Sequence, residues 1–115
     1  MTTDDKKPEL TVADLFANVH ELVESKGFLC EPRRQTMYIM EELGEFTTNI
    51  LAATEASKEG KAPDKVETAM ICEEAFDVVW NVFATLSSLG ITSEVFAGFA
   101  RDKMRVNAGR TFRED

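Results

Sequence analysis

Apolar residues recur at helical spacing in four separate segments of the chain. The first segment begins where Thr11 and Asp14 form a capping-box pattern, and Gly27 is placed to end it. Between these signals one face of the expected helix carries Val12, Leu15, Phe16, Val19, Leu22 and Val23. The pattern therefore predicts an amphipathic helix over roughly residues 12–26.

Three further helices follow from the same reasoning. A helix over about residues 32–56 carries the apolar stripe Ile39, Leu43, Phe46 and Ile50, and the segment 57–63 with Gly60 and Pro63 is the loop after it. A helix over about residues 64–88 is unusually apolar in its second half and ends before Gly90, so we expect it to be largely buried. Thr92 or Ser93 then caps a fourth helix that reaches Gly109, with its apolar positions at Val95, Phe96, Phe99, Met104 and Val106.

The fold class follows from these four helices and their short links. No segment shows sustained strand alternation, and short connections favour antiparallel neighbours in an all-α bundle. We expect residues 1–10 to be a flexible polar leader and residues 11–112 to form one domain.

Composition narrows the function classes. With 115 residues and 43% hydrophobic content the chain can form a packed core, although a chain this short leaves apolar surface that an oligomer would hide. The formal net charge of −8 argues against nucleic acid and against anionic membranes as partners. A basic strip within residues 101–113 suits a small anionic ligand better than a polymer.

Cysteine and histidine are scarce. Cys30 and Cys72 lack CxxC spacing and His20 is the lone histidine, so a zinc site is excluded and no disulfide is required. The N-terminus has no apolar signal region, and no apolar run is long enough to span a bilayer. We therefore expect a cytoplasmic protein.

Two acidic motifs are the strongest candidates for chemistry. The second helix contains Glu41-Glu42-x-x-Glu45 and the third contains Glu74-x-x-Asp77. Acids three residues apart share one helix face, where they repel each other unless a cation or solvent screens them. If the two helices pack side by side, four carboxylates converge into an oxygen-only site, which suits Mg²⁺, or alternatively Mn²⁺.

The alternative interpretation of both motifs is a solvated acidic face. On a helical wheel Glu42 flanks the apolar stripe of its helix, whereas Glu41 lies nearly opposite the stripe. In the third helix Glu74, Asp77 and Asn81 form one polar row along an otherwise apolar segment. That row is either the solvent-exposed edge of the helix or a polar site in the interior of the bundle. The row Lys103, Asn107 and Arg110 on the fourth helix is either a surface feature favoured by the helix dipole or the phosphate-binding side of the same site.

These motifs together resemble the MazG-like nucleotide pyrophosphohydrolases of the all-α NTP pyrophosphatase superfamily. The similarity rests on EExxE followed by ExxD on the middle helices, and on the K-x3-N-x2-R string formed by Lys103, Asn107 and Arg110. It covers nearly the whole chain. It implies a four-helix MazG-like bundle completed by dimerisation, as a homodimer or homotetramer.

The resemblance also implies an activity and a set of roles. The expected reaction is Mg²⁺-dependent hydrolysis of a nucleoside triphosphate such as a dNTP to the monophosphate and pyrophosphate, as in cleansing of the nucleotide pool. The metal ligands carry over to Glu42, Glu45, Glu74 and Asp77. Lys103, Asn107, Arg110 and Asn81 would bind phosphate or sugar, and Glu41 and Glu73 are the remaining acids near the reaction.

Base recognition has weaker candidates. Trp80, Tyr38 and Phe16 could stack on a base, but core or dimer-interface roles fit them better. Gln35 and Asn18 could read a base edge, and His20 is expected to be a surface or hydrogen-bonded histidine. Two competing functions stay open: a non-catalytic helical adaptor or oligomerisation module, and a related pyrophosphohydrolase of a phosphoribosyl-nucleotide.

Overall fold

The computed structural model describes residues 9–26 and 31–110, and all regular structure in these two ranges is α-helical. The helices are α1 (Val12–Lys26), α2 (Pro32–Lys58), α3 (Lys65–Ser88) and α4 (Ser93–Ala108). The all-α prediction is confirmed, and α2 extends two residues beyond its expected end. The predicted leader up to residue 8 and the predicted stop at Gly27 lie outside the described residues.

Capping side chains fix where the helices begin. Thr11 and Asp14 form the predicted reciprocal box, with the Asp14 amide donating to Thr11 Oγ1 at 3.0 Å and the Thr11 amide donating to Asp14 Oδ2 at 3.3 Å. Asp64 and Glu67 form a second capping box at α3, and the Thr92 side chain accepts from the Val95 amide at α4. Gly60 and Gly90, which follow α2 and α3, have φ of 79° and 78°, a conformation that glycine adopts without steric cost.

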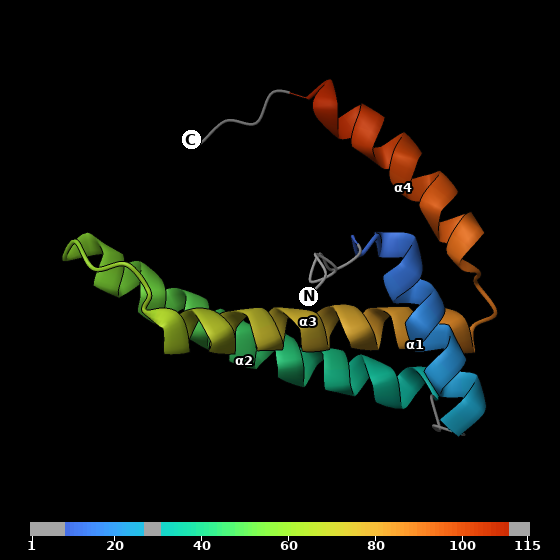
Figure 1. The fold of residues 1–115 in the computed structure, drawn as a ribbon, viewed down its shortest axis with the longest axis horizontal. Helices are drawn as coiled ribbons and strands as arrows, with labels where there is room; N and C mark the ends of the chain where they lie inside the picture. The colour runs from blue at the N-terminus through green and yellow to red at the C-terminus, as the bar shows by residue number, and fades with distance from the viewer. Residues whose placement is uncertain (1–8, 27–30, 111–115) are drawn as a thin grey trace, which may run out of the picture.

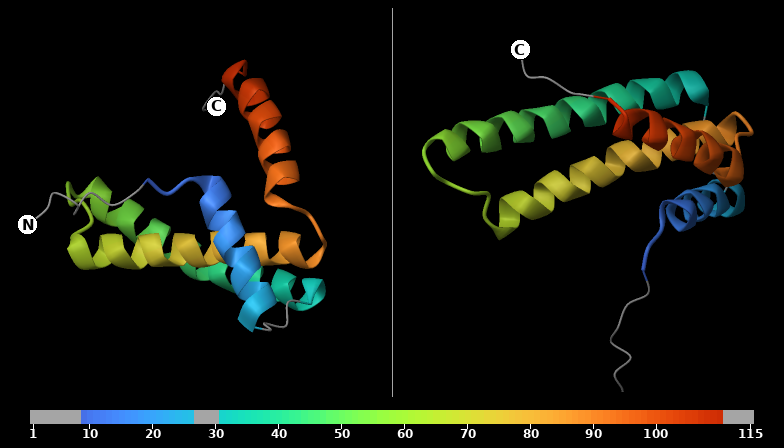
Figure 2. Two further views of the ribbon diagram at one scale, coloured as in Figure 1. Left: turned by 45° about the vertical axis from the view of Figure 1, so that its right-hand side comes forward. Right: turned by 90° about the horizontal axis from the view of Figure 1, so that it is seen from above.

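The longest helices, α2 and α3, run antiparallel and side by side, and α1 crosses the carboxyl-terminal end of α3 (Figures 1 and 2). The buried apolar side chains lie at this crossing and comprise Phe16, Val19, Phe83 and Ala84. The rings of Phe16, Phe83 and Phe96, which we call the aromatic cluster, join α1, α3 and α4 with centroids 4.8 to 5.7 Å apart. This crossing is the hydrophobic core of the described chain.

Helix α4 points away from the pair formed by α2 and α3 (Figure 1). Its backbone approaches α1, but among the described residues it makes no close backbone contact with α2 or α3. The radius of gyration is 17.5 Å, whereas a compact chain of this length has about 13 Å. The four helices of one chain therefore do not close into a compact bundle.

The open arrangement corrects several burial predictions. Leu43 and Ile50 of the expected α2 stripe are exposed, as are Phe76 and Val79 of α3, so α3 is not largely buried in a single chain. On α4 the exposed apolar residues are Val95, Phe99, Met104 and Val106. The predicted periodicity is present, but none of the helices in the described ranges covers these faces. No helix in the described ranges has the length and apolar character to cross a membrane.

Candidate functional site

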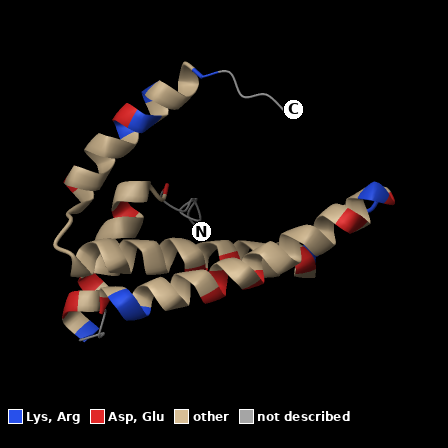
Figure 3. Ribbon diagram, turned by 180° about the vertical axis from the view of Figure 1, so that it is seen from behind, with Lys and Arg blue, Asp and Glu red and all other residues tan. Residues whose placement is uncertain are grey.

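A row of polar side chains runs between α2 and α3. We call it the polar seam, and it consists of Gln35, Glu42 and Asn49 on α2 and of Glu74, Asp77 and Asn81 on α3. The three α2 residues are spaced by seven, so they share one face over four turns. Figure 3 shows acidic segments on both helices of this pair and basic segments on α4.

Hydrogen bonds between side chains join the two helices at both ends of the polar seam. Gln35, which is only 3% exposed, donates from Nε2 to Asn81 Oδ1 at 3.2 Å. Asn81 in turn donates from Nδ2 to the backbone carbonyl of Asp77 at 2.9 Å. At the other end Asn49 donates from Nδ2 to Glu74 Oε1. These bonds hold Glu74 and Asn81 in defined orientations.

Glu42 lies between these two bonded pairs and is half-buried. The pKa of Glu42 is raised above its ordinary value of 4.5, first by desolvation. Neighbouring negative charges raise it further, in the order Glu45, Asp77, Glu41 and Glu74. Acids of two different helices therefore contribute to the electrostatic potential at Glu42.

The other predicted acids differ in accessibility. Glu74 is half-buried, whereas Glu45 and Asp77 are exposed beside it. Glu41 and Glu73 are exposed, and the contrast between Glu41 and Glu42 agrees with the helical wheel. Within the described ranges, no three His, Cys, Asp or Glu side chains are grouped closely enough to form a ready-made metal site. Like charges at these positions favour separated rotamers.

The donor set nevertheless fits a hard divalent cation. Glu42, Glu45, Glu74 and Asp77 offer only carboxylate oxygens, which Mg²⁺ and Mn²⁺ prefer. The hydrogen bond from Asn49 occupies one oxygen of Glu74 and leaves Oε2 without that donor. Glu45 and Asp77 are exposed, so their side chains are not held in place by packing.

The predicted phosphate-binding row is on α4 and is exposed. Lys103 and Asn107 line an open hollow of 520 Å³ together with Phe96, Phe99 and Met104, and Arg110 follows the end of the helix. Because α4 does not approach α2, a single chain does not bring this row to the acidic residues. The expected three-helix site is therefore not assembled within one chain.

The base-reading candidates are mostly engaged elsewhere. Phe16 is 1% exposed within the aromatic cluster, and Trp80 is partly buried against the same core. Gln35 is bonded to Asn81, which leaves Tyr38 and Asn18 as the exposed candidates.

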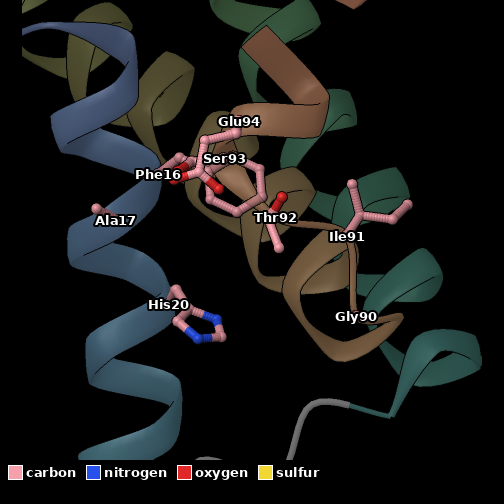
Figure 4. A pocket seen from close by; sticks show the side chains of 8 residues that line it. All are labelled: Phe16, Ala17, His20, Gly90, Ile91, Thr92, Ser93 and Glu94. Atoms are coloured by element: carbon pink, nitrogen blue, oxygen red, sulfur yellow. The ribbon is translucent and has the colours of Figure 1, made fainter. Parts of the chain in front are cut away.

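His20 lies at a second pocket, between α1 and the start of α4. This cavity of about 280 Å³ is lined by Phe16, Ala17, His20, Gly90, Ile91, Thr92, Ser93 and Glu94 (Figure 4). His20 Nδ1 is hydrogen-bonded to Ser87 Oγ on α3, and Nε2 is 3.9 Å from Glu24 Oε1. The prediction that His20 is a surface or hydrogen-bonded histidine is confirmed, because its side chain is half-exposed and has a partner.

The contacts that the sequence did not predict include Asn49 with Glu74 and His20 with Ser87. The first had a signal in the sequence, since Asn49 follows Glu42 by seven residues and must share its face. The second joins residues 67 positions apart, and no local pattern indicates such a pair.

Comparison with known proteins gives no assignment: no family model, no curated protein and no solved structure matches the chain.

Proposed function

We propose that this protein is a Mg²⁺-dependent nucleoside triphosphate pyrophosphohydrolase of the MazG-like kind. The observation that carries the proposal is the polar seam, where half-buried Glu42 and Glu74 lie on two packed antiparallel helices, with the acids Glu45 and Asp77 one turn further along each helix. Acidic side chains close together repel each other and lower the stability of the fold. A cation bound between them would offset this repulsion and stabilise the folded form.

The carboxylates of Glu42, Glu45, Glu74 and Asp77 would hold the metal. Together they carry a charge of about −4, which one or two divalent ions offset. Mg²⁺ bound there would supply Lewis-acid polarisation of phosphate oxygens and a lower pKa for a bound water. Oxygens of the substrate phosphates would be further ligands of the kind that such ions prefer.

Cations on the opposite side of the substrate would complete the charge balance. Lys103 and Arg110 neutralise the β and γ phosphates while water attacks the α-phosphorus and the α–β anhydride bond breaks. The products are a nucleoside monophosphate and pyrophosphate. Asn81 retains one N–H of its amide beyond the bond to the Asp77 carbonyl, and this N–H and the Asn107 amide can bind phosphate or sugar.

The proposed active form is a homodimer, alone or paired into a tetramer. Support comes from the exposed apolar faces of all the long helices and from the large radius of gyration. Since α4 of one chain lies away from α2, we propose that α4 of a second copy brings Lys103, Asn107 and Arg110 to the carboxylates. The opposite charges of the α4 row and the acidic residues favour this arrangement.

The proposal is tested by product analysis. Purified protein with Mg²⁺ is incubated with a panel of dNTPs, NTPs and a phosphoribosyl-nucleotide, and pyrophosphate and orthophosphate are measured separately. We expect pyrophosphate with the matching monophosphate from at least one triphosphate. Release from the phosphoribosyl-nucleotide alone would replace the proposed substrate class, and release from no substrate would contradict the proposed activity.

Two variants link that activity to the polar seam. Glu42→Gln and Asp77→Asn keep the shape of each side chain but remove its charge, so we expect at least about a 10³-fold loss of turnover with unchanged helicity by circular dichroism. Full turnover in both variants would contradict the assignment.

A further inference from the structure

Asn49 contacts Glu74, one of the proposed metal ligands, from the facing helix. It lies on the face of α2 that meets α3, seven residues after Glu42, and its amide donates to Glu74 Oε1 across the helix interface. Gln35, seven residues before Glu42, donates across the same interface to Asn81. Each amide bonds a residue of the polar row on α3.

The direction of the Asn49 bond matters. A carboxylate that accepts an N–H is held by a charge-assisted hydrogen bond, which is stronger than a bond between neutral groups. Glu74 has several rotatable bonds, and ordering such a side chain costs rotamer entropy. The hydrogen bond from Asn49 therefore orders the Glu74 side chain in part before any cation binds.

The same bond gives the two carboxylate oxygens of Glu74 different surroundings. Oε1 accepts from Asn49, while Oε2 has no hydrogen-bond donor among the described residues. The amide adds no charge, so it orients Glu74 without competing for a cation as Lys or Arg would. An ion pair at this place would instead neutralise the carboxylate.

We propose that Asn49 is a positioning residue that holds Glu74 by Oε1 and presents Oε2 to a divalent cation bound at the α2–α3 polar seam. The inference rests on the proposed function only for the presence of the cation site. Asn49 raises the affinity for the metal because it orients Glu74, and it acts on no other ligand.

A structural role alone makes a different prediction. If Asn49 only joined the helices, its removal would lower stability and would affect metal binding equally with or without Glu74. The double-mutant cycle over Asn49 and Glu74 separates these cases, because it isolates their coupling.

The experiment is a titration of the full-length protein with the metal alone. Mg²⁺ binding is followed by calorimetry, and Mn²⁺ binding by the EPR signal of the free ion, which also measures weak sites. The variants are Asn49→Ala, Glu74→Ala, the double variant and, as matched control, Thr48→Ala. Thr48 is the adjacent residue of α2, and its hydroxyl bonds the Gly44 carbonyl of its own helix.

We expect Asn49→Ala to weaken metal binding by about 10- to 100-fold, the usual effect of losing a residue that orients a ligand. Thr48→Ala should leave the Kd unchanged. In the Glu74→Ala background the loss of Asn49 should add nothing further. Asn49→Leu, which is similar in shape but has no hydrogen-bond donor, should reproduce the effect of Asn49→Ala and serves if the alanine variant does not fold.

The outcomes separate this inference from the proposed activity. Wild-type affinity in Asn49→Ala, or an equal loss in both backgrounds, overturns the role of Asn49 alone. Absence of metal binding by the wild type overturns this inference together with the proposed metal site. Weakened binding in Asn49→Ala with no nucleotide turnover supports Asn49 and overturns the proposed activity.

Discussion

Helix α3 packs against other helices in two regions, and the two interfaces differ in chemical character. Near its carboxyl end, Phe83 and Ala84 are buried against α1, and the rings of Phe16 and Phe96 lie within 6 Å of Phe83 by centroid. Further toward its start, Glu74, Asp77 and Asn81 meet α2 through amides and acids. The aromatic cluster is apolar and closed, whereas the polar seam is half-exposed and charged.

The two regions therefore contribute differently to the stability of the fold and to the proposed binding of a cation. Burial of apolar surface stabilises the fold at the aromatic cluster. At the polar seam the mutual repulsion of the acids opposes folding, and two hydrogen bonds between side chains offset only part of it. We therefore assign the hydrophobic core to the first region and the proposed cation site to the second, and the predictions below test that division.

The largest expected effect on folding is at the aromatic cluster. Phe16→Ala should lower the free energy of unfolding by about 3–5 kcal/mol, because it leaves a cavity beside the rings of Phe83 and Phe96. Urea denaturation measures the change. Leu10→Ala, at an exposed residue just before α1, should stay within about 0.5 kcal/mol of wild type. Equal losses in the two variants would contradict the placement of the core.

The next effect concerns the basic row of α4. Arg110→Ala should lower turnover by about 10²-fold, because one transition-state contact to phosphate is lost. The far-ultraviolet circular dichroism of the variant should match wild type, since Arg110 is exposed and follows the last turn of α4. Steady-state kinetics measures this change, and unaltered turnover would remove Arg110 from the proposed site.

Mixing inactive variants tests whether α4 acts on a second copy. After subunit exchange between Glu42→Gln and Arg110→Ala, half of the dimers are mixed and each has one intact site, so about a quarter of wild-type activity should return. A mixture of Glu42→Gln with Asp77→Asn should stay inactive, because both changes fall on the α2–α3 pair. No recovery in the first mixture would place α4 over its own chain.

The sequence was sufficient for the helices and for part of the site. Thr11 with Asp14, and Thr92, mark helix starts through local chemistry, and the wheel separates half-buried Glu42 from exposed Glu41 by angle alone. The exposure of Leu43 and Ile50 was not predictable, because periodicity identifies an apolar face but not its partner. The bond from Asn49 to Glu74 depends on the register between two helices, which neither sequence segment contains.

The smallest expected effect is a pH dependence of the metal-free protein. The pKa of Glu42 is raised in the folded state, so the folded state binds its proton more tightly than the unfolded state. The contribution of Glu42 to stability should therefore fall as pH rises from the ordinary value of 4.5 through the raised value. Urea midpoints across this interval should fall less steeply in Glu42→Gln. Glu73→Gln should follow wild type, because Glu73 is exposed and is not among the charges that raise the pKa of Glu42.

The most direct test of the central claim is a thermal melt with and without millimolar Mg²⁺. A cation that binds only the folded form stabilises it, by about 2.7 kcal/mol at 100 times its Kd. We predict a higher midpoint for the wild type in Mg²⁺, and no shift for Glu42→Gln or Asp77→Asn. A wild-type midpoint unchanged by Mg²⁺, with or without a nucleotide analogue, would contradict the cation site and favour a non-catalytic helical oligomerisation module.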